Sequence, residues 1–278
     1  MTQPTPPLFT IPIPPLGPHP GGTIVATEPA PAVYLLTITS PPDNRLTTAS
    51  CTALLDALDM IQCGGYPPGV LVTTSGVPKF YSNGLDLEHA LSTEGFLPGV
   101  LFRLFHRLLT YPMPTIALLP GHAFAAGLML AMHHDYRVMS PSKGYACVNE
   151  LDFGVPLKPA MSSIFRIKLS PQTYRTLVLE AHRFGGAAAV EAGIVDRLGG
   201  LDEVLKLVEE RKLMTKGKTG IYGLLKAEMY RESLALLSAE GHADGEKRER
   251  ELVAAEERRR EEGERRVQGL REQEKAKL

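Results

Sequence analysis

Apolar residues fall into short runs that alternate with stretches of helical periodicity through the middle of the chain. The short runs, bounded by turn residues, predict buried strands at 33–38, 69–74 and 115–119. Between them, apolar positions three and four residues apart predict helices near 48–62 and 98–109. Strands that alternate with helices at this spacing are typical of an α/β fold built around a mostly parallel sheet.

The second half of the chain has a mostly helical pattern. Helices are expected at 170–182, 186–208 and 221–238, with a Gly199-Gly200 turn interrupting the second. The third has apolar residues along one face, which indicates a helix that covers the core or forms a subunit contact. From these patterns we divide the chain into a leader (1–31), a core (32–200), a helical covering region (201–240) and a tail (241–278).

Proline is concentrated at the start of the chain, where ten of the 23 prolines lie within residues 1–31. Each proline fixes φ and removes a hydrogen-bond donor, so a helix is excluded and a polyproline-like, partly ordered leader is expected. The leader has neither a basic start nor a continuous apolar stretch, unlike a secretory signal. An apolar run long enough to cross a membrane occurs nowhere in the sequence, so no membrane-spanning helix is expected.

Charge is concentrated at the other end, where residues 240–278 hold 12 acidic and 11 basic side chains. Glu and Arg residues four positions apart favour a solvated helix over 245–277, with too few apolar residues for a coiled coil. The net charge of the whole chain is −1, which argues against a strongly basic nucleic-acid binder. The three cysteines have no CxxC spacing and indicate neither a disulfide scaffold nor a zinc site.

Two glycine-containing segments, SNGLD at 82–86 and AFAAG at 123–127, follow predicted buried strands. Ligands collect at the carboxyl ends of strands in α/β proteins, and small residues there allow backbone N–H groups to approach a ligand. A helix that begins near Ala126 adds the positive end of its dipole. Two N–H groups that converge on one oxygen would form an oxyanion hole. The spacing is also compatible with ordinary turns, because glycines after strands usually form them.

The residues in and around these segments resemble the crotonase (enoyl-CoA hydratase/isomerase) superfamily. KFYSNGLDL at 79–87 and GHAFAAGLMLAMHHDYRVM at 121–139 look like its two signatures. YACVNELDFGVPL at 145–157 follows at the family distance, and HRFGGAAAVEAGIVDRL at 182–198 resembles a later helix and turn. The second and third segments are most similar to peroxisomal Δ3,Δ2-enoyl-CoA isomerases. The resemblance spans about residues 33–238 and implies a ββα spiral core with C-terminal helices.

Carried over by position, the resemblance places the acid/base glutamate of the family on Glu150. It places the two oxyanion donors on the backbone N–H groups of Leu85 and Ala126. Hydratases of this family carry a second glutamate where this chain has Met129, which we interpret as a wall of the acyl pocket. The substrate-binding residues implied in this way are Ser82, Asn83, Gly84, Leu85, Asp86, Ala126, Gly127 and Met129.

A single carboxylate is suited to isomerisation. Moving the double bond of a 3-enoyl-CoA to trans-2-enoyl-CoA requires a proton to leave C2 and to return at C4. One carboxylate that reaches both carbons does this without activating water, provided that the thioester enolate is stabilised. We expect the apolar neighbours Val148, Leu151 and Phe153 to raise the pKa of Glu150 by desolvating its charged form. The expected function is that of an isomerase in fatty-acid β-oxidation, with CoA arriving on the substrate and no other cofactor.

Two alternatives stay open. One is another crotonase-type reaction, chiefly hydration, including one in a secondary-metabolite pathway; Met129 argues against hydration. The other is a non-catalytic acyl-CoA-binding or scaffolding relative that uses the charged tail as an interaction arm. The intact Glu150 and both loop motifs argue against this second alternative.

The remaining candidates lie outside these segments or carry weaker signals. Lys79 precedes the first loop, where it either meets a CoA phosphate as a point charge or is an ordinary surface lysine. His122, His133 and His134 lack the spacing of a ligand set, so we expect structural roles for them and no metal site.

The chain ends in Ala276-Lys277-Leu278, which resembles the C-terminal peroxisomal address of the SKL type. The expected partners are therefore an acyl-CoA substrate and a peroxisomal import receptor, and the expected location is the peroxisome. The family resemblance further implies a homotrimer or hexamer.

Overall fold

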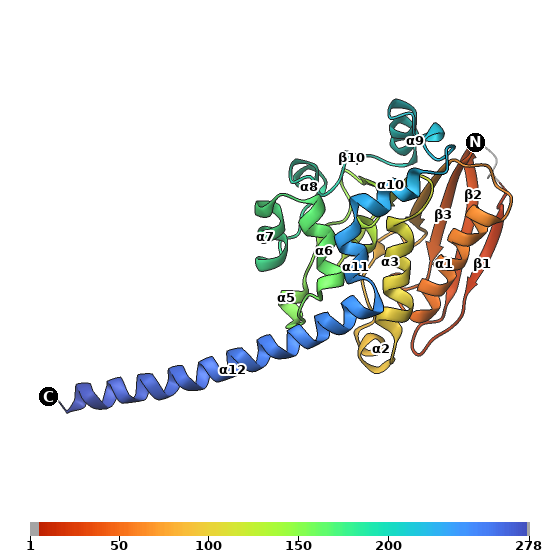
Figure 1. The fold of residues 1–278 in the computed structure, drawn as a ribbon. Coiled ribbons are helices and arrows are strands. Elements are labelled where there is room, and N and C mark those ends of the chain that lie inside the picture. Colours follow the sequence, from red (N-terminus) through yellow and green to blue (C-terminus); the bar gives the residue numbers. More distant parts are fainter. Residues whose placement is uncertain (1–5, 277–278) are drawn as a thin grey trace.

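A computed structural model describes residues 6–276 and contains two sheets, one large and one small. The first strands of the large sheet lie at one side of the body (Figure 1). The strand order of the large sheet is β1-β2-β3-β4-β6-β8-β10. β1, β2 and β3 pair antiparallel, and every pairing from β3 onward is parallel. Its strands are β1 (Phe9–Ile13), β2 (Gly22–Ala30), β3 (Val33–Thr39), β4 (Val70–Ser75), β6 (Thr115–Leu119), β8 (Tyr136–Met139) and β10 (Arg197–Leu198).

The central strands are apolar on both faces because both faces are covered. Val70 and Val72 of β4 belong to the smaller apolar cluster on one face, which is closed by α9 (Leu201–Glu210) through residues such as Val204. Leu71, on the opposite face of the same strand, belongs to the main core beneath the larger group of helices. Continuous apolar runs are what a parallel sheet buried on two sides requires. The predicted α/β class with a mostly parallel sheet is confirmed.

The small sheet is built from three very short parallel strands, in the order β5-β7-β9. These are β5 (Phe80–Ser82), β7 (His122–Phe124) and β9 (Ala146–Cys147). They come from segments far apart in the sequence, and their carboxyl ends therefore meet at one edge.

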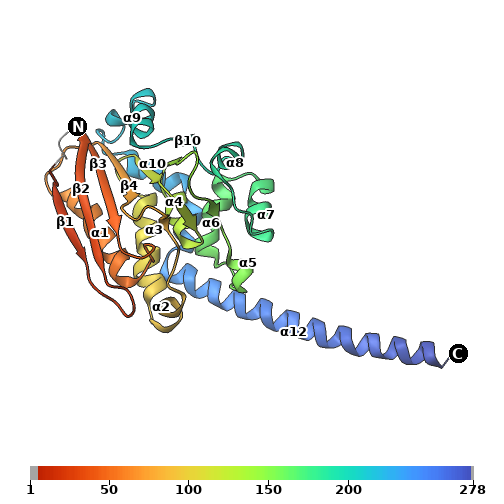
Figure 2. The ribbon, with the colours of Figure 1, turned by 180° about the vertical axis from the view of Figure 1, so that it is seen from behind.

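The helices of the first two thirds of the chain flank the sheets (Figures 1 and 2). They are α1 (Thr48–Cys63), α2 (Leu87–Ser92), a π-helical turn (Leu97–Leu101), α3 (Phe102–Leu109), α4 (Ala126–Met132), α5 (Glu150–Phe153), α6 (Pro159–Lys168) and α7 (Pro171–Leu179). α1 begins with a capping box, in which Thr47 accepts from the N–H of Ser50 and the Ser50 side chain accepts from the N–H of Thr47. Residue periodicity predicted α1 to within one residue of its observed bounds, and the predicted helix over 98–109 divides into the π-helical turn and α3.

The later helices are shorter than the sequence pattern indicates. The stretch 186–208 divides into α8 (Gly186–Glu191), strand β10 and α9, and 221–238 divides into α10 (Tyr222–Met229) and α11 (Arg231–Leu236). A short 3₁₀ turn (Leu213–Thr215) lies between α9 and α10. None of the helices among residues 6–276 is both long enough and apolar enough to span a membrane.

The prediction of a polyproline-like leader over 1–31 is wrong for most of its described part. Residues 9–13 and 22–30 form β1 and β2, which add two antiparallel strands to the sheet. Ile24 and Ala26 of β2 are fully buried against α1 and the core, so alternating apolar residues outweigh the proline content. Among residues 6–31, the prolines lie before, in and after the edge strand β1 and at and after the end of β2, where a missing donor is tolerated.

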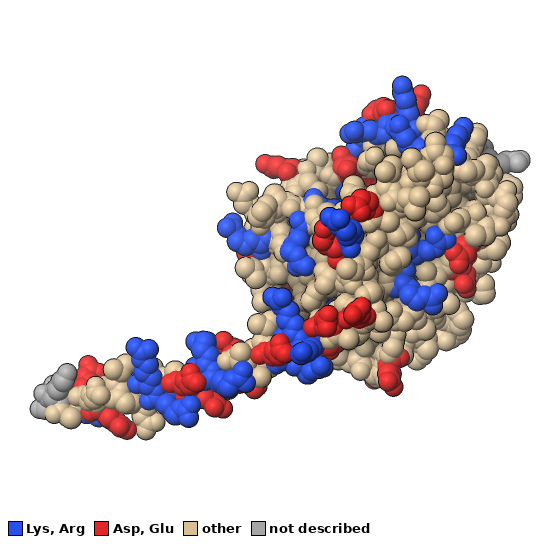
Figure 3. Space-filling view, viewed as in Figure 1, with Lys and Arg blue, Asp and Glu red and all other residues tan. Residues whose placement is uncertain are grey.

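The charged tail forms one long helix, α12 (Ala239–Lys275), which extends away from the body (Figures 1 and 2). None of its residues is buried, and positive and negative side chains alternate along it (Figure 3). Only its first turns contact the body, where Lys158 Nζ lies 2.5 Å from Glu246 and 3.2 Å from Glu249. The predicted solvated helix is therefore present. Of the terminal tripeptide only Ala276 is described; Lys277 and Leu278 lie outside the described residues.

Candidate active site

Three loops at one edge of the small sheet bring the principal predicted site residues together. Leu85 follows the end of β5, Ala126 follows the end of β7, and Glu150 follows the end of β9, each within three residues. All three residues line one cavity of about 230 Å³. The edge at which the carboxyl ends of parallel strands meet is the usual location of a ligand site in α/β folds.

Small residues allow the first two loops to pack against each other. A Cβ atom on Gly84 would lie 3.0 Å from the Cβ of Ala125, and one on Gly127 would lie 2.3 Å from the carbonyl oxygen of Ser82. Gly84 also has a φ of +83°, in the left-handed region that favours glycine. The loop after β5 and the start of α4 are therefore held in direct contact.

The start of α4 is an unusual turn. Ala125 has φ 49° and ψ −125°, a conformation rare for a residue with a side chain. It makes the chain reverse sharply between β7 and α4. Within the described residues, neither the N–H of Ala126 nor that of Leu85 has a hydrogen-bond acceptor. Two free backbone donors beside one cavity are the elements of an oxyanion hole.

Glu150 opens α5 beside these donors. Its Oε2 atom is buried and has no hydrogen-bond partner within the described part of the chain. Burial, which desolvates the charged carboxylate, raises its pKa to about 7. A carboxyl group with this pKa exchanges protons readily at neutral pH, as a general acid or base must.

The predicted apolar surroundings of Glu150 are only partly as expected. Val148 is buried and Phe153 lines the cavity, but Leu151 is 57% exposed and is not among the lining residues. Half of the apolar lining residues come from α2 and from the loop between α5 and α6. The lining residues are Arg45, Asn83, Leu85, Leu87, Ala90, Leu91, Leu97, Ala125, Ala126, Asn149, Glu150, Phe153, Val155, Pro156, Leu157, Lys158 and Met161.

Several residues predicted to bind substrate make contacts that support the loops. The Ser82 hydroxyl donates to the carbonyl of Asn44 at 2.8 Å. The Asp86 carboxylate accepts from the backbone N–H of His89 at 2.8 Å and thereby caps α2. Gly84 and Gly127 allow the loop after β5 to pack directly against the start of α4, as described above. Of the segment 82–86, only Asn83 and Leu85 line the cavity.

Met129 and Lys79 lie away from the cavity. Met129 is fully buried in the main core, so the interpretation of this residue as a wall of the acyl pocket does not match the cavity. Lys79 is exposed with its ammonium 5.4 Å from the Phe80 ring centroid, at the opposite end of β5 from the cavity.

The histidines have structural surroundings. His133 and His134 are fully buried, and each ring bonds to a carbonyl of α4 one turn earlier. Burial lowers the pKa of both to about 3, so both are neutral. His122 packs against the rings of Phe80, Phe124 and Tyr145. No cluster of three or more metal-ligating side chains occurs among residues 6–276.

Sequence reasoning missed three polar residues of the cavity. Arg45 lies 40 residues from the loop it contacts, within a segment that we interpreted only as a turn. Asn149 precedes Glu150, and its buried Oδ1 has no partner among the described residues. Lys158 lines the cavity and also pairs with α12. The sole sequence signal was the cluster Asp43-Asn44-Arg45 just before a helix, which is unusually polar for this charge-poor body.

The fold and the site agree with comparisons to known proteins. The sequence profile of the family "Enoyl-CoA hydratase/isomerase" matches residues 28–270. The chain is 33% identical over 224 residues to the peroxisomal enoyl-CoA delta isomerase 2 of Arabidopsis thaliana. The aligned residues make up 75% of this chain and 92% of that protein. It is also 33% identical to isomerase 1 of the same plant over 213 residues, with 73% and 88% covered.

Solved structures share the architecture. A probable enoyl-CoA hydratase from Mycobacterium tuberculosis superposes with a TM-score of 0.70 at 25% identity, over 84% of this chain and 98% of that one. The human mitochondrial delta3-delta2-enoyl-CoA isomerase gives a TM-score of 0.70 at 21% identity, over 81% and 89% of the two chains, and supports the fold alone. The chain belongs to the enoyl-CoA hydratase/isomerase family, and the predicted crotonase fold is confirmed.

Proposed function

We propose that this protein is a Δ3,Δ2-enoyl-CoA isomerase. The observation that carries the proposal is the carboxyl group of Glu150, whose buried Oε2 atom has no hydrogen-bond partner among the described residues, in the same cavity as the free N–H groups of Leu85 and Ala126. The thioester oxygen of a 3-enoyl-CoA would accept from both N–H groups as a proton leaves C2. The same carboxyl group would then return the proton at C4.

The make-up of the cavity supports isomerisation over hydration. Glu150 is its only Asp or Glu side chain among the described residues that line it, whereas adding water in this family ordinarily uses two glutamates. Met129, at the position of the second glutamate, lies in the core. The peroxisomal isomerases at 33% identity agree with this choice. CoA belongs to the substrate, so the proposed reaction needs no other cofactor.

A two-substrate assay tests the proposal. Purified full-length protein is given a 3-enoyl-CoA in one reaction and trans-2-enoyl-CoA in the other. We expect the first to be converted to trans-2-enoyl-CoA and the second to gain little water. Rapid hydration without isomerisation would instead show a hydratase. No turnover with either substrate, together with tight acyl-CoA binding, would favour a non-catalytic relative.

We further propose a peroxisomal location, β-oxidation as the pathway, and a homotrimer or hexamer in solution. The location is supported by the C-terminal sequence 276–278 and by the peroxisomal names of the two Arabidopsis relatives. A tagged protein that lacks residues 276–278 should stay in the cytosol while the full chain enters peroxisomes.

The proposed homotrimer or hexamer is tested by sedimentation equilibrium, which gives the mass of the assembly as a multiple of the 30.3 kDa chain mass.

A further inference from the structure

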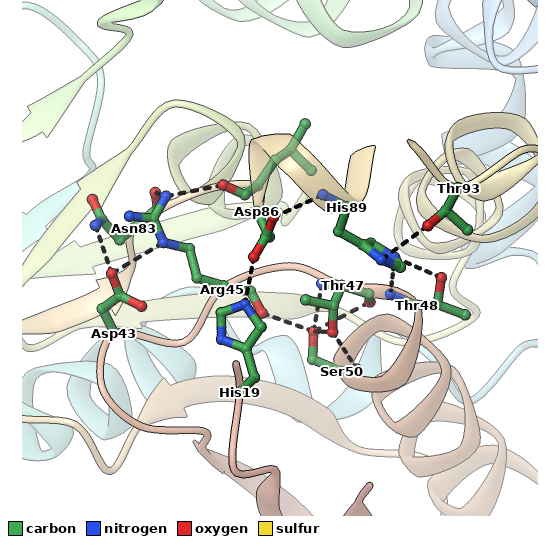
Figure 4. A network of polar contacts seen from close by, with 11 residues as sticks. His19, Asp43, Arg45, Thr47, Thr48, Ser50, Asn83, Asp86, His89 and Thr93 are labelled. Carbon is green, nitrogen blue, oxygen red and sulfur yellow. Dashed lines mark hydrogen bonds and ion pairs between the residues drawn. The ribbon is translucent and has the colours of Figure 1, made fainter. Parts of the chain in front are cut away.

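Arg45 links the segment before α1 to the loop that carries Leu85. Its Nη1 atom donates to the carbonyl oxygens of Asn83 at 3.1 Å and Leu85 at 2.9 Å. Its Nε atom donates to Asp43 Oδ2 at 3.0 Å (Figure 4). The guanidinium is thus oriented by a carboxylate on one side and binds two carbonyls on the other, a use of its planar fork that a lysine ammonium does not reproduce.

The residue after it completes the set. The backbone N–H of Leu46 donates to the carbonyl oxygen of Gly84 at 2.8 Å. Three successive carbonyls, those of Asn83, Gly84 and Leu85, are therefore all bound by donors from Arg45 and Leu46. A loop with three consecutive carbonyls fixed on one side has little freedom to rotate its peptide planes.

Peptide geometry converts this arrangement into a direction for the Leu85 N–H. The carbonyl of Gly84 and the N–H of Leu85 belong to one planar trans peptide, so they point in opposite directions. Binding the carbonyl to Leu46 turns the N–H away from Leu46, and Leu85 lines the cavity whereas Leu46 does not. Hydrogen bonding at the carbonyl also polarises the same peptide, which makes its N–H a better donor.

Further bonds fix both ends of the loop (Figure 4). The side chain of Asn83 donates to Asp43 at 2.7 Å, and its backbone N–H donates to the Asp43 carbonyl at 3.0 Å. At the other end, the Asp86 carboxylate lies 2.6 Å from Nε2 of His19. Between these fixed ends, Arg45 is the one side chain among the described residues that binds the carbonyls next to the donor peptide.

We propose that Arg45 is a positioning residue that aims the Leu85 N–H at the oxygen of the substrate thioester. The proposal rests on the isomerase function proposed above and adds a residue that acts through the loop rather than on the reacting carbons. A charge-only role would be satisfied by lysine, whereas the positioning role requires the planar guanidinium, which binds Asp43 through Nε while Nη1 binds both carbonyls.

Acetoacetyl-CoA provides a direct measurement, because its enolate absorbs in the ultraviolet and its oxygen would occupy the same place as that of the reaction intermediate. The apparent pKa for enolate formation in the bound state reports how strongly the cavity holds an oxyanion. In Arg45→Met we expect this apparent pKa to rise by about one to two units. We expect kcat to fall about ten- to hundredfold with a smaller change in KM, a part of the loss seen when one donor is removed.

Two further variants make the result specific. Arg45→Lys keeps the charge and should behave like Arg45→Met. Arg107→Met is the matched control, because Arg107 also pairs with an aspartate, Asp59, at 2.7 Å but lies outside the cavity; it should match the wild type. Thermal unfolding shows whether each variant is folded, and in folded variants the pKa of Glu150 in the kcat/KM profile should not move.

The outcomes separate this proposal from the isomerase function. An unchanged enolate pKa and kcat in folded Arg45→Met would overturn the positioning role, and full activity in Arg45→Lys would replace it with a role for charge alone. If Arg45→Met does not fold but Arg45→Lys does, the lysine variant alone decides the question. A loss of enolate stabilisation in Arg45→Lys would support the proposal, and full activity in it would overturn the proposal. A wild type that neither isomerises 3-enoyl-CoA nor stabilises bound enolate would instead remove the proposed function.

Discussion

Two of the three buried side-chain oxygen atoms that have no hydrogen-bond partner among residues 6–276 belong to residues that line the cavity. These atoms are Oε2 of Glu150 and Oδ1 of its neighbour Asn149. Burying an acceptor without a donor costs free energy, so proteins rarely retain such atoms without a use for them. Here the cost raises the pKa of Glu150, and a carboxylate in ordinary hydrogen bonds would be a weaker base.

Glu150→Gln tests the proposed base. The amide has nearly the shape of the carboxyl group but does not accept a proton from C2. We expect kcat for 3-enoyl-CoA to fall by at least about two orders of magnitude, with acyl-CoA binding retained. Asp152→Asn, two residues later on the exposed side of α5, is the matched control and should keep wild-type turnover. Unchanged turnover in Glu150→Gln would remove this residue from the mechanism.

The pH dependence of activity follows from the same carboxyl group. A general base must be ionised in the free enzyme, so kcat/KM should rise with pH to a plateau, with a midpoint near a pKa of about 7. A profile measured from pH 5 to 9 shows the midpoint. A midpoint near 4.5, the ordinary value of a glutamate, would contradict the burial argument.

The raised pKa also predicts how stability varies with pH. The unfolded chain ionises Glu150 near pH 4.5 but the folded chain only near pH 7, so wild-type stability falls through this window and the loss is complete above it. Glu150→Gln avoids this loss. We expect the variant to be more stable above pH 7 by an amount on the order of 2 kcal/mol, and equal to the wild type below pH 4. Thermal unfolding of both proteins at pH 4 and pH 8 measures the difference.

Ala125 stores strain at the turn that presents Ala126. Its positive φ costs an alanine about 1–3 kcal/mol, whereas glycine adopts it freely. After allowing for the greater freedom of glycine in the unfolded chain, Ala125→Gly should stabilise the fold by about 1 kcal/mol. Ala131→Gly, the same change within α4, should destabilise it by about as much. Urea unfolding compares the two, and destabilisation by Ala125→Gly would show that the turn is not strained.

At the scale of elements, the sequence predicted those whose side-chain pattern is long enough to recognise. The strands at 33–39, 70–75 and 115–119 and the helix at 48–63 fell within a residue or two of their predicted bounds. The small sheet was beyond such reasoning, because strands of two or three residues show no periodicity. The family resemblance supplied the loop residues that these strands carry, and not the strands themselves.

Contacts distant in sequence explain most of what was missed. The role of Arg45 depends on carbonyls 38 and 40 residues away, and nothing in the local pattern indicates which segment will face it. Met129 was interpreted as a pocket residue because its family position carries chemistry, whereas the structure places it in the main apolar core. In the leader, the alternation of the buried residues Ile24 and Ala26 indicates the strand β2 better than the high proline content indicates a polyproline-like structure.

The base of α12 is attached to the body through Lys158. This lysine pairs with Glu246 and Glu249, and Gly245 lies close enough that an added Cβ would be 3.5 Å from Pro159.

Lys158→Met should loosen the first turns of α12, because no buried apolar residue of this helix replaces the ion pairs. We expect faster hydrogen exchange in residues 239–250 and no change in exchange of β4. Arg259→Met, farther along α12 where the Arg259–Glu256 pair is exposed, should leave 239–250 unaffected. Unchanged exchange at 239–250 in Lys158→Met would mean that other contacts hold the helix.

At the scale of the whole molecule, α12 contacts the body through its first turns but adds no residue to either apolar cluster. The two apolar clusters lie on opposite faces of the large sheet within the body, and neither includes a residue of α12. A chain that ends after Val253 should therefore keep the melting temperature of the full chain within about 2 °C and keep its turnover. A large loss of either would show that the distal helix stabilises the body, directly or through an assembly.

The proline-rich first strand has a consequence for how the protein behaves when concentrated. β1 is the outermost strand of a seven-stranded sheet, and an open edge of this kind can recruit strands from other molecules. Pro12 interrupts that edge and Pro14 and Pro15 follow it directly, so an incoming strand would find no amide hydrogen at these positions. The prolines that hid this strand from prediction thus limit the edge-to-edge stacking of molecules into fibres. Replacing the three prolines with valine should make the purified protein precipitate more readily.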